Sequence, residues 1–266
     1  MARNLLEISK RRRRRWALIK FSAWILATVA ALGGLVSLFY IPSLRLKTIS
    51  ISGLEGVRET ELREELYLAL SGKYLRVLPK DHLLFLPKKE LEAVLRSKLR
   101  IEEFSVEREF PSTLEISVRE RKSWAIWCRQ EAETLKECAL ADKSGFIFAA
   151  SPIFSGSAVL KIIDERPDSY LGRYVLEPEK FAALTSFMER LESKTNEEIA
   201  ALEIKPAEVL NIVLKSGWFL VIDLETDFGR ALENLTIALN EIGERKEKLE
   251  YADLRFADKI FYRFKE

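Results

Sequence analysis

The chain has few residues of the types that commonly bind metals or act as catalytic groups. Its 266 residues include one histidine, two cysteines and two methionines. His82 has no second histidine and no suitably spaced cysteine or acidic cluster to join it, so a packing or surface role is predicted rather than a metal site. The G-x-S-x-G, P-loop and G-x-G-x-x-G motifs are absent as well. The sequence therefore predicts a protein that is not an enzyme and has no catalytic residue, metal or cofactor.

Residues 21–40 contain no charged side chain, whereas basic side chains are concentrated just before them. Residues 1–20 carry eight basic side chains, among them Arg11 to Arg15, and one acid, Glu7. Twenty uncharged residues, at about 1.5 Å each in a helix, span the roughly 30 Å of a bilayer's hydrocarbon core. Because basic residues mark the cytoplasmic side, we predict a basic cytoplasmic tail over residues 1–20 that contacts anionic lipid. A single-pass transmembrane helix follows over residues 21–41, and the C-terminal part lies outside the cell membrane.

Three other interpretations of this segment were weighed. A cleavable signal peptide has a shorter apolar region, about 7 to 15 residues, and small residues at its cleavage site, whereas residues 35–41 stay apolar. A buried core helix would be unusually long and would have no polar face. The arginines would suit nucleic-acid binding or targeting, but beside an apolar span they are more simply a topogenic signal. An uncleaved anchor is the favoured interpretation.

The outside part also lacks low-complexity runs and Gly/Ser linkers. The whole chain has a net charge of +2 and residues 1–41 have +7, so residues 42–266 have −5. A mildly acidic part argues against nucleic acid as a partner, because nucleic-acid binding needs a basic face. Its length suits one large domain or two small ones that abut.

The two cysteines both fall in the outside part, where disulfides persist. Cys128 and Cys138 flank a polar stretch, residues 129–133, which predicts a hairpin with the sulfurs opposite each other. A bridge closing this loop would contribute roughly 2.8 kcal/mol by the chain-entropy relation. Two buried free thiols are the alternative if the compartment is not oxidising.

A compact α+β module is predicted over residues 44–121. Alternating side chains predict strands at residues 47–52 and on both sides of the Phe110-Pro111-Ser112 turn. Leucines at helical spacing predict one helix capped by Thr60 and a second that begins near Pro87 and includes Leu99. The order β-α-α-β-β places the helices on one face of a small sheet. These patterns alone would also fit a ferredoxin-like unit.

The last of these three strands carries a longer motif. Residues 111–121, P-S-T-L-E-I-S-V-R-E-R, closely resemble the last strand of the POTRA domain in the bacterial division proteins FtsQ and DivIB. Leu140, Asp142, Gly145 and Phe148 form L-x-D-x-x-G-x-x-F, which is similar to the hairpin that opens the β domain of that family. Asp253-Leu254-Arg255, followed by a final strand, is similar to the family's C-terminal end. The resemblance implies a POTRA domain over residues 44–121 and a β domain over residues 122–266.

The second outside part is predicted to be a mixed sheet with flanking helices. Apolar spacing predicts helices at residues 178–193 and 228–242, and alternation predicts strands at residues 199–204, 209–214 and 218–224. Residues 151–176 carry no motif that predicts an element. The fold class expected overall is therefore α+β, with one N-terminal transmembrane helix.

Function follows from the resemblance. It implies a divisome scaffold in the cell membrane at the division septum, which recruits FtsB/DivIC-type and FtsL-type proteins and other divisome components through the POTRA domain. Partner binding is expected by strand addition to the last strand, because a terminal strand leaves backbone groups unpaired. The residues assigned to this site are Lys259, Ile260, Phe261, Tyr262, Arg263 and Phe264. If that strand is internal, its aromatic side chains simply fill the core.

Two other classes stay open at this level. A POTRA-containing secretion or envelope-assembly factor would use the same module to bind extended polypeptides, but normally with a downstream membrane barrel, and the sequence after Arg121 lacks the repeated lipid-facing strands. A membrane-anchored envelope enzyme would need a nucleophile, and a Ser/Lys pair remains open because the chain has several such residues.

Overall fold

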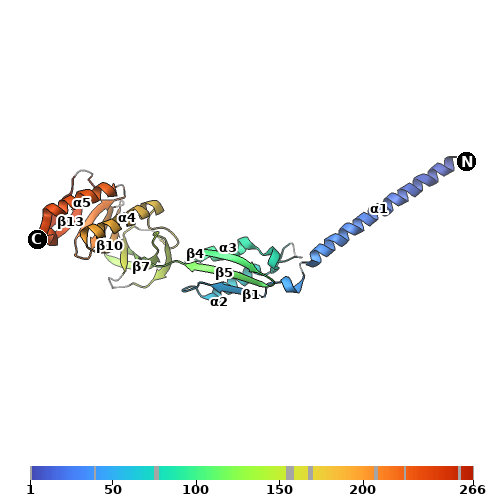
Figure 1. Ribbon diagram of the computed structural model, residues 1–266, viewed down its shortest axis with the longest axis horizontal. Coiled ribbons are helices and arrows are strands. Elements are labelled where there is room, and N and C mark those ends of the chain that lie inside the picture. Colours follow the sequence, from blue (N-terminus) through green and yellow to red (C-terminus); the bar gives the residue numbers. More distant parts are fainter. Residues whose placement is uncertain are drawn as a thin grey trace. The chain divides into compact units, whose positions relative to one another are not determined.

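The computed structural model describes residues 2–38, 40–74, 78–153, 159–166, 170–206, 209–224, 226–256 and 259–265. The chain divides into two compact units, Met1–Glu120 and Arg121–Glu266. Both units combine helices and sheets (Figure 1), and the predicted α+β class is confirmed.

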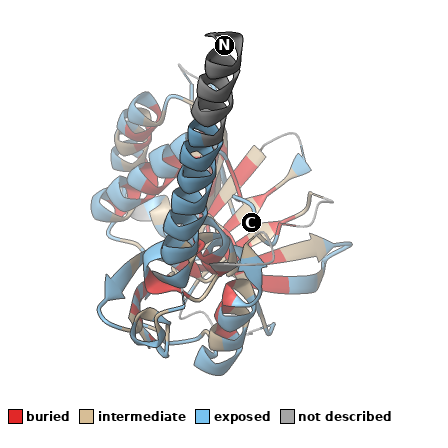
Figure 2. Cartoon of the chain, turned by 90° about the vertical axis from the view of Figure 1, so that its right-hand side faces the viewer, coloured by how far each residue is buried: buried red, intermediate tan, exposed pale blue. Residues whose placement is uncertain are grey.

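The N-terminal helix α1 runs from Ala2 to Leu38 and is longer than predicted. Its apolar stretch, Trp16–Ser37, has a mean hydropathy of 1.8 and none of it is buried. Figure 2 shows the described part of this helix in the colour of exposed residues. Among the described residues, this is the one helix long and apolar enough to cross a bilayer. The helix includes the basic tail and ends before residue 41, because the chain turns at Tyr40, whose N–H bonds to Ser37 (3.0 Å).

The first unit contains a three-stranded sheet in the order β1-β5-β4, with β1 parallel and β4 antiparallel to the central β5. The expected order of strands and helices is confirmed: β1 Thr48–Ser52, α2 Glu59–Leu70, α3 Lys88–Ser97, β4 Ile101–Glu109 and β5 Thr113–Glu120. The prediction missed a small ribbon of β2 (Lys73–Tyr74) and β3 (Leu78–Pro79), and the single turns η1 (Pro42–Leu44) and η2 (Leu83–Phe85).

Leucine and isoleucine side chains from one face of the sheet and from both helices form the core of this unit. Its fully buried members are Ile49, Leu62, Leu66, Leu91, Leu95, Leu114 and Ile116, together with Leu83 from the turn η2. Two predictions at the helix ends were wrong. The cap of α2 is Arg58, which has an extended backbone, so Thr60 lies inside the first turn. Leu99 lies after α3, because Lys98 is already extended.

The second unit contains one mixed, nine-stranded sheet in the order β14-β13-β12-β11-β10-β9-β6-β7-β8. Pairs β6/β9, β9/β10 and β12/β13 are parallel and the others are antiparallel. The strands are β6 Ala125–Glu131, β7 Thr134–Ala141, β8 Ile147–Ser151, β9 Leu160–Asp164, β10 Ile199–Ile204, β11 Val209–Leu214, β12 Phe219–Asp223, β13 Leu249–Asp253 and β14 Phe261–Phe264.

Helices α4 (Pro178–Thr195) and α5 (Phe228–Ile242) pack on one face of this sheet (Figure 1). The turn η4 (Gly243–Lys248) follows α5. Each helix connects two parallel neighbours, β9 to β10 and β12 to β13, which is the usual crossover for parallel strands. Phe181, Leu184, Phe187, Leu191 and Leu235 are buried against the sheet. Core residues of both helices thus lie within the ranges predicted from apolar spacing, although Phe187 was not part of the predicted stripe.

The stretch left unassigned in sequence contains a central strand. β9 lies between β6 and β10, while residues 154–158 and 167–169 of the same stretch lie outside the described residues. The hairpin turn was also placed too widely, because strand pairing continues to Glu131 and Thr134, and only Ala132 and Glu133 adopt positive φ. A two-residue turn of this kind suits the twist of a hairpin.

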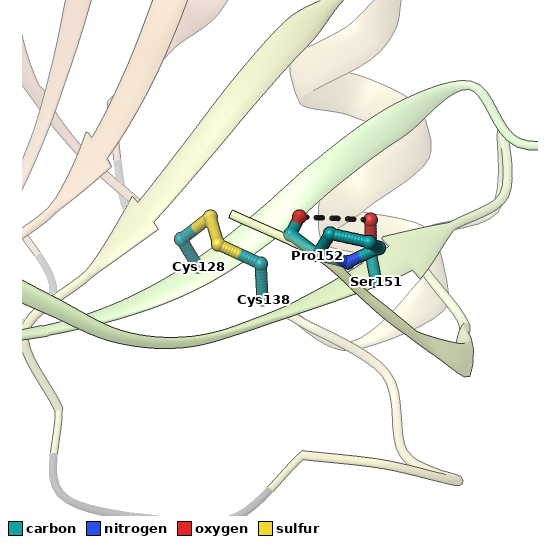
Figure 3. The surroundings of a disulfide bond; sticks show 4 residues. All are labelled: Cys128, Cys138, Ser151 and Pro152. Atoms are coloured by element: carbon teal, nitrogen blue, oxygen red, sulfur yellow. Dashed lines mark hydrogen bonds between the residues drawn. A yellow bond between two sulfur atoms is a disulfide. The ribbon is translucent and has the colours of Figure 1, made fainter. Parts of the chain in front are cut away.

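Cys128 of β6 and Cys138 of β7 are directly paired in register and joined by a disulfide (Figure 3). Both are buried, and together with Ile126 they form a small apolar cluster separate from the core under the helices. Since alternate residues of β6 (Ala125 and Trp127) belong to the helix-covered core, the disulfide lies on the opposite face of the sheet.

Candidate partner-binding edge

The last strand, β14, is an edge of the nine-stranded sheet. It pairs on one side with β13, antiparallel, with Arg263 opposite Tyr251 and Phe261 opposite Asp253. It is shorter than predicted, because Lys259 and Ile260 precede the first residue of the strand. The alternative that this strand is internal is therefore wrong.

Within the described residues, β14 pairs with another strand on one side, so the other side of its backbone is open. The N–H of Lys265 donates to the carbonyl of Lys248 at 2.7 Å. In an extended chain alternate residues point their backbone groups the same way, so Arg263 and Phe261 also face β13. The N–H and C=O groups of Tyr262 and Phe264 consequently point to the open edge. An added strand would find two donors and two acceptors there.

Side chains of the predicted site fall into two groups. Ile260 and Phe264 are partly buried and pack against the core under the helices, as a filling role would require. Phe261 and Tyr262 remain 52% and 44% exposed, so both offer apolar surface beside the edge. Lys259 is also exposed.

The side chain of Arg263 is bound to two residues of the neighbouring strand β13. Its guanidinium makes two hydrogen bonds of 2.5 Å to the carboxylate of Glu250 and lies 5.2 Å from the ring centroid of Tyr251. The hydrogen bonds from Arg263 lower the pKa of Glu250. Arg263 therefore holds β14 on β13, and a role in selecting a partner is secondary to this contact.

Two exposed apolar residues beside the edge were missed in sequence. Ile237 on α5 is 60% exposed and lines a groove of about 280 Å³ with Ile260 and Tyr262. Phe256, 50% exposed, makes an edge-on contact with Phe261, with ring centroids 5.2 Å apart. A signal existed for Ile237, because it interrupts the polar face of a helix whose inward stripe is already complete.

The D-L-R motif, Asp253-Leu254-Arg255, stabilises the end of β13, where the chain leaves toward β14. Asp253 accepts hydrogen bonds from the backbone N–H of Arg255 (3.1 Å) and from its guanidinium, the closest at 2.6 Å. Burial works to raise the pKa of Asp253, but these bonds outweigh it and the pKa is lowered. The same arrangement recurs at the end of β9, where Arg166 binds Asp164 through its backbone and side chain. Both sites follow an L-x-x-x-D-x-R pattern, a repeat that the sequence shows and that was missed.

The motif at the end of β5 also has a structural role. The carboxylate of Glu120 accepts backbone N–H bonds from Glu55, Gly56 and Val57, at 2.8, 3.0 and 2.9 Å. It closes the loop that follows β1. Burial works to raise the pKa of Glu120, but the three backbone bonds and the charge of Arg100 lower it. The neighbouring Arg121 belongs to the second unit, where it forms an ion pair with Asp142.

The hairpin motif around Asp142 is a turn, as predicted. Its Oδ1 accepts hydrogen bonds from the backbone N–H groups of Ser144 (2.8 Å) and Phe146 (3.1 Å), and Gly145 has a φ of +80°. His82 is buried in the first unit with its ring 5.7 Å from that of Phe85, which is a packing role. Among the described residues no group of three or more His, Cys, Asp or Glu is placed to hold a metal ion.

Comparison with known proteins agrees with these motifs. Residues 44–121 match the POTRA domain of the FtsQ type. The cell division protein FtsQ of Alcanivorax borkumensis is 21% identical over 236 residues, which cover 88% of this chain and 83% of that protein. The chain therefore contains a POTRA domain of the FtsQ type and is similar to a cell division protein FtsQ over most of its length. The resemblance seen in the sequence is thus confirmed, and it extends over both units.

These similarities indicate the broad role. An FtsQ-type POTRA domain and a match to a cell division protein over most of the chain indicate a non-enzymatic part in cell division. The family also implies divisome partners, and α1 is consistent with a single-pass membrane anchor.

Proposed function

We propose that this FtsQ-family chain is a scaffold that recruits FtsB/DivIC-type and FtsL-type membrane division proteins to the septum by strand addition at β14. Residues 1–20 form the cytoplasmic tail on anionic lipid, residues 21–41 the anchor, residues 44–121 the POTRA domain and residues 122–266 the β domain. The POTRA domain takes further divisome components. The observation that supports the proposal most is the open edge at Tyr262 and Phe264, flanked by exposed apolar side chains.

The size of the edge indicates how binding is divided between backbone and side chains. Two residues with outward backbone groups offer four hydrogen bonds, each worth about 1 kcal/mol net. A total of about 4 kcal/mol corresponds to a dissociation constant near 1 mM, too weak for a lasting assembly. Phe261, Tyr262 and Ile237 therefore supply the remaining affinity by burying their exposed surface against alternate side chains of the partner strand and the segment beside it.

The division role is favoured over secretion or envelope assembly because the match to a division protein covers 88% of the chain and hence both units. The orientation is supported by the eight basic residues before the apolar stretch, since such residues stay cytoplasmic. Protease added outside intact cells or spheroplasts should therefore degrade the two units and spare the tail.

The direct test is titration of the full chain in nanodiscs with the outside domains of FtsB/DivIC-type and FtsL-type proteins. A chain ending at Asp258 should lose binding. Full-strength binding by that shortened chain would refute the site.

A matched pair of substitutions separates backbone from side-chain recognition. Tyr262→Ala removes the ring, while Tyr262→Pro removes the ring and the outward N–H as well. Proline is tolerated on an edge strand where its nitrogen faces solvent. The loss of about 1 kcal/mol more in the proline variant corresponds to roughly fivefold weaker binding. Equal affinities of the two variants would exclude a backbone ladder at this residue.

A further inference from the structure

Large apolar side chains are exposed at one end of the POTRA domain, the end at which the chain enters it from α1. Leu84, Phe85 and Phe110 are 42%, 48% and 58% exposed. We call these three residues the anchor-proximal patch. Exposed side chains of this size require a reason when they gather in one place.

Backbone contacts bring the three residues to the same end. The N–H of Lys47 donates to the carbonyl of Ser112 at 2.8 Å, which sets the incoming chain beside the turn that carries Phe110. The N–H of Leu46 donates to the carbonyl of Asp81 at 2.8 Å, three residues before Leu84.

A side-chain contact links the two halves of the patch. Arg108, two residues before Phe110, donates to the carbonyl of Leu84 at 3.2 Å. The patch is therefore assembled from two loops around the incoming chain.

Basic side chains surround the patch. The exposed ones on the same segments are Arg45, Lys47, Lys88, Lys89 and Arg108. The acids on or beside these segments are Asp81, Glu90 and Glu109; Asp81 is paired with Arg45 at 2.7 Å and Glu90 with Lys80 at 2.6 Å, while Lys88 lies 3.8 Å from Glu92. This end is thus cationic, although residues 42–266 as a whole have a net charge of −5. Apolar rings within a ring of cations match the chemistry of an anionic lipid surface.

The anchor keeps this end close to such a surface. Helix α1 ends at Leu38, and Leu46 is already bonded to the POTRA domain. Eight residue steps reach at most about 28 Å when fully extended. The turn of Pro42–Leu44 shortens this reach, because a 3-10 helix rises only about 2 Å per residue.

We propose that the anchor-proximal patch docks on anionic lipid headgroups of the membrane leaflet from which α1 emerges. Phe110, Phe85 and Leu84 enter the interface, where apolar and aromatic side chains are favoured, and the basic residues around them contact the phosphates. Docking would hold the POTRA domain at the membrane and limit the positions from which it meets other division proteins. The proposal rests on anchoring by α1 and is independent of partner binding at β14.

Photocrosslinking of the full chain in nanodiscs tests the proposal without any partner protein. The probes are Phe110→p-benzoylphenylalanine and, as the control, Glu61→p-benzoylphenylalanine, which is exposed on the first turn of α2 beyond the other end of β1. In discs of phosphatidylglycerol mixed with phosphatidylcholine we expect at least about threefold more lipid adduct at residue 110 than at residue 61. In pure phosphatidylcholine the yield at residue 110 should fall.

A charge variant keeps the test independent of the apolar probe. Lys47→Gln with Lys89→Gln leaves the core residues and the contact between Arg108 and Leu84 untouched and should lower the adduct yield at residue 110 in the anionic discs only. Hydrogen exchange of β1 and β5 verifies that the domain stays folded. Three results would each overturn the proposal. They are equal adduct yields at residues 110 and 61, an adduct yield at residue 110 that does not change with lipid charge, and adducts to a second copy of the chain instead of lipid.

Discussion

Replacing Glu120 by glutamine tests how the POTRA domain is closed. The carboxylate accepts three backbone N–H groups of the loop after β1 and is largely buried. Charge-assisted bonds are roughly twice as strong as neutral ones, so an amide that keeps the geometry loses about half of the interaction. We expect Glu120→Gln to cost about 2 kcal/mol and Glu120→Ala about 3 kcal/mol of unfolding free energy. For a domain of this size, 2 kcal/mol lowers Tm by about 8–16 °C.

The pH dependence of the same variant gives an independent result. The pKa of Glu120 lies below its ordinary value of 4.5. The carboxylate therefore contributes stability above pH 4.5, and this contribution is lost as the pH falls through the lowered pKa. The difference in unfolding free energy between the native chain and Glu120→Gln should be constant near neutral pH and shrink below pH 4.5.

Hydrogen exchange of the full chain in detergent is the suitable assay, because it reports each unit separately. Amides of β1 and β5 should exchange faster in Glu120→Gln, while those of the second unit should not change. Glu115→Gln, at an exposed position of the same strand, is the control and should match the native chain. Unchanged exchange in Glu120→Gln, or a difference that persists at low pH, would refute the reasoning.

Three further predictions concern single contacts. When the chain is denatured without reductant, a thiol titration should find no free thiol, and after reduction it should find two; two thiols before reduction would exclude the disulfide. The double variant Cys128→Ala with Cys138→Ala should lose about 2.8 kcal/mol of unfolding free energy. Gly53→Ala should cost about 3 kcal/mol or more in a denaturant titration, because φ is +82° and a Cβ would lie 2.0 Å from the carbonyl oxygen of Val118. Gly72→Ala, with φ of +95° and no atom within 4 Å, should lose only about 1–2 kcal/mol, and equal losses would exclude the clash. Asp253→Asn should weaken the stabilisation of the end of β13 by about 1.5 kcal/mol and speed exchange of residues 261–265 about tenfold, and unchanged exchange there would contradict a stabilising role.

Local patterns predicted the regular elements well. Strands β10 and β11 and helix α5 have the bounds read from alternation and helical spacing. These signals are local, because the side-chain period of a strand or helix follows from its own backbone. Helix ends were less accurate, as at Arg58 and Leu99, since an end depends on where the chain leaves the helical conformation and not on the apolar period.

β9 was missed for a different reason. Its residues Leu160 to Asp164 show no strict alternation of apolar and polar side chains, and the strand is completed by neighbours that lie far away in sequence, β6 and β10. Parallel pairing of this kind leaves no hairpin signal. The candidate edge had a partial signal, because the terminal position of β14 suggested an edge, while the exposure of Ile237 and Phe256 depended on packing.

The sequence by itself determined the long apolar N-terminal helix, the α+β class and the resemblance to FtsQ, because hydropathy, alternation and short motifs act over neighbouring residues. Only the tertiary structure decided that β14 is an edge with its free groups at Tyr262 and Phe264, that Arg263 is bound to Glu250, and that Glu120 closes the loop after β1. Each of these depends on contacts between residues 13 to 65 positions apart. Such contacts form only when the sheets assemble, so their partners cannot be read from the local pattern of the chain.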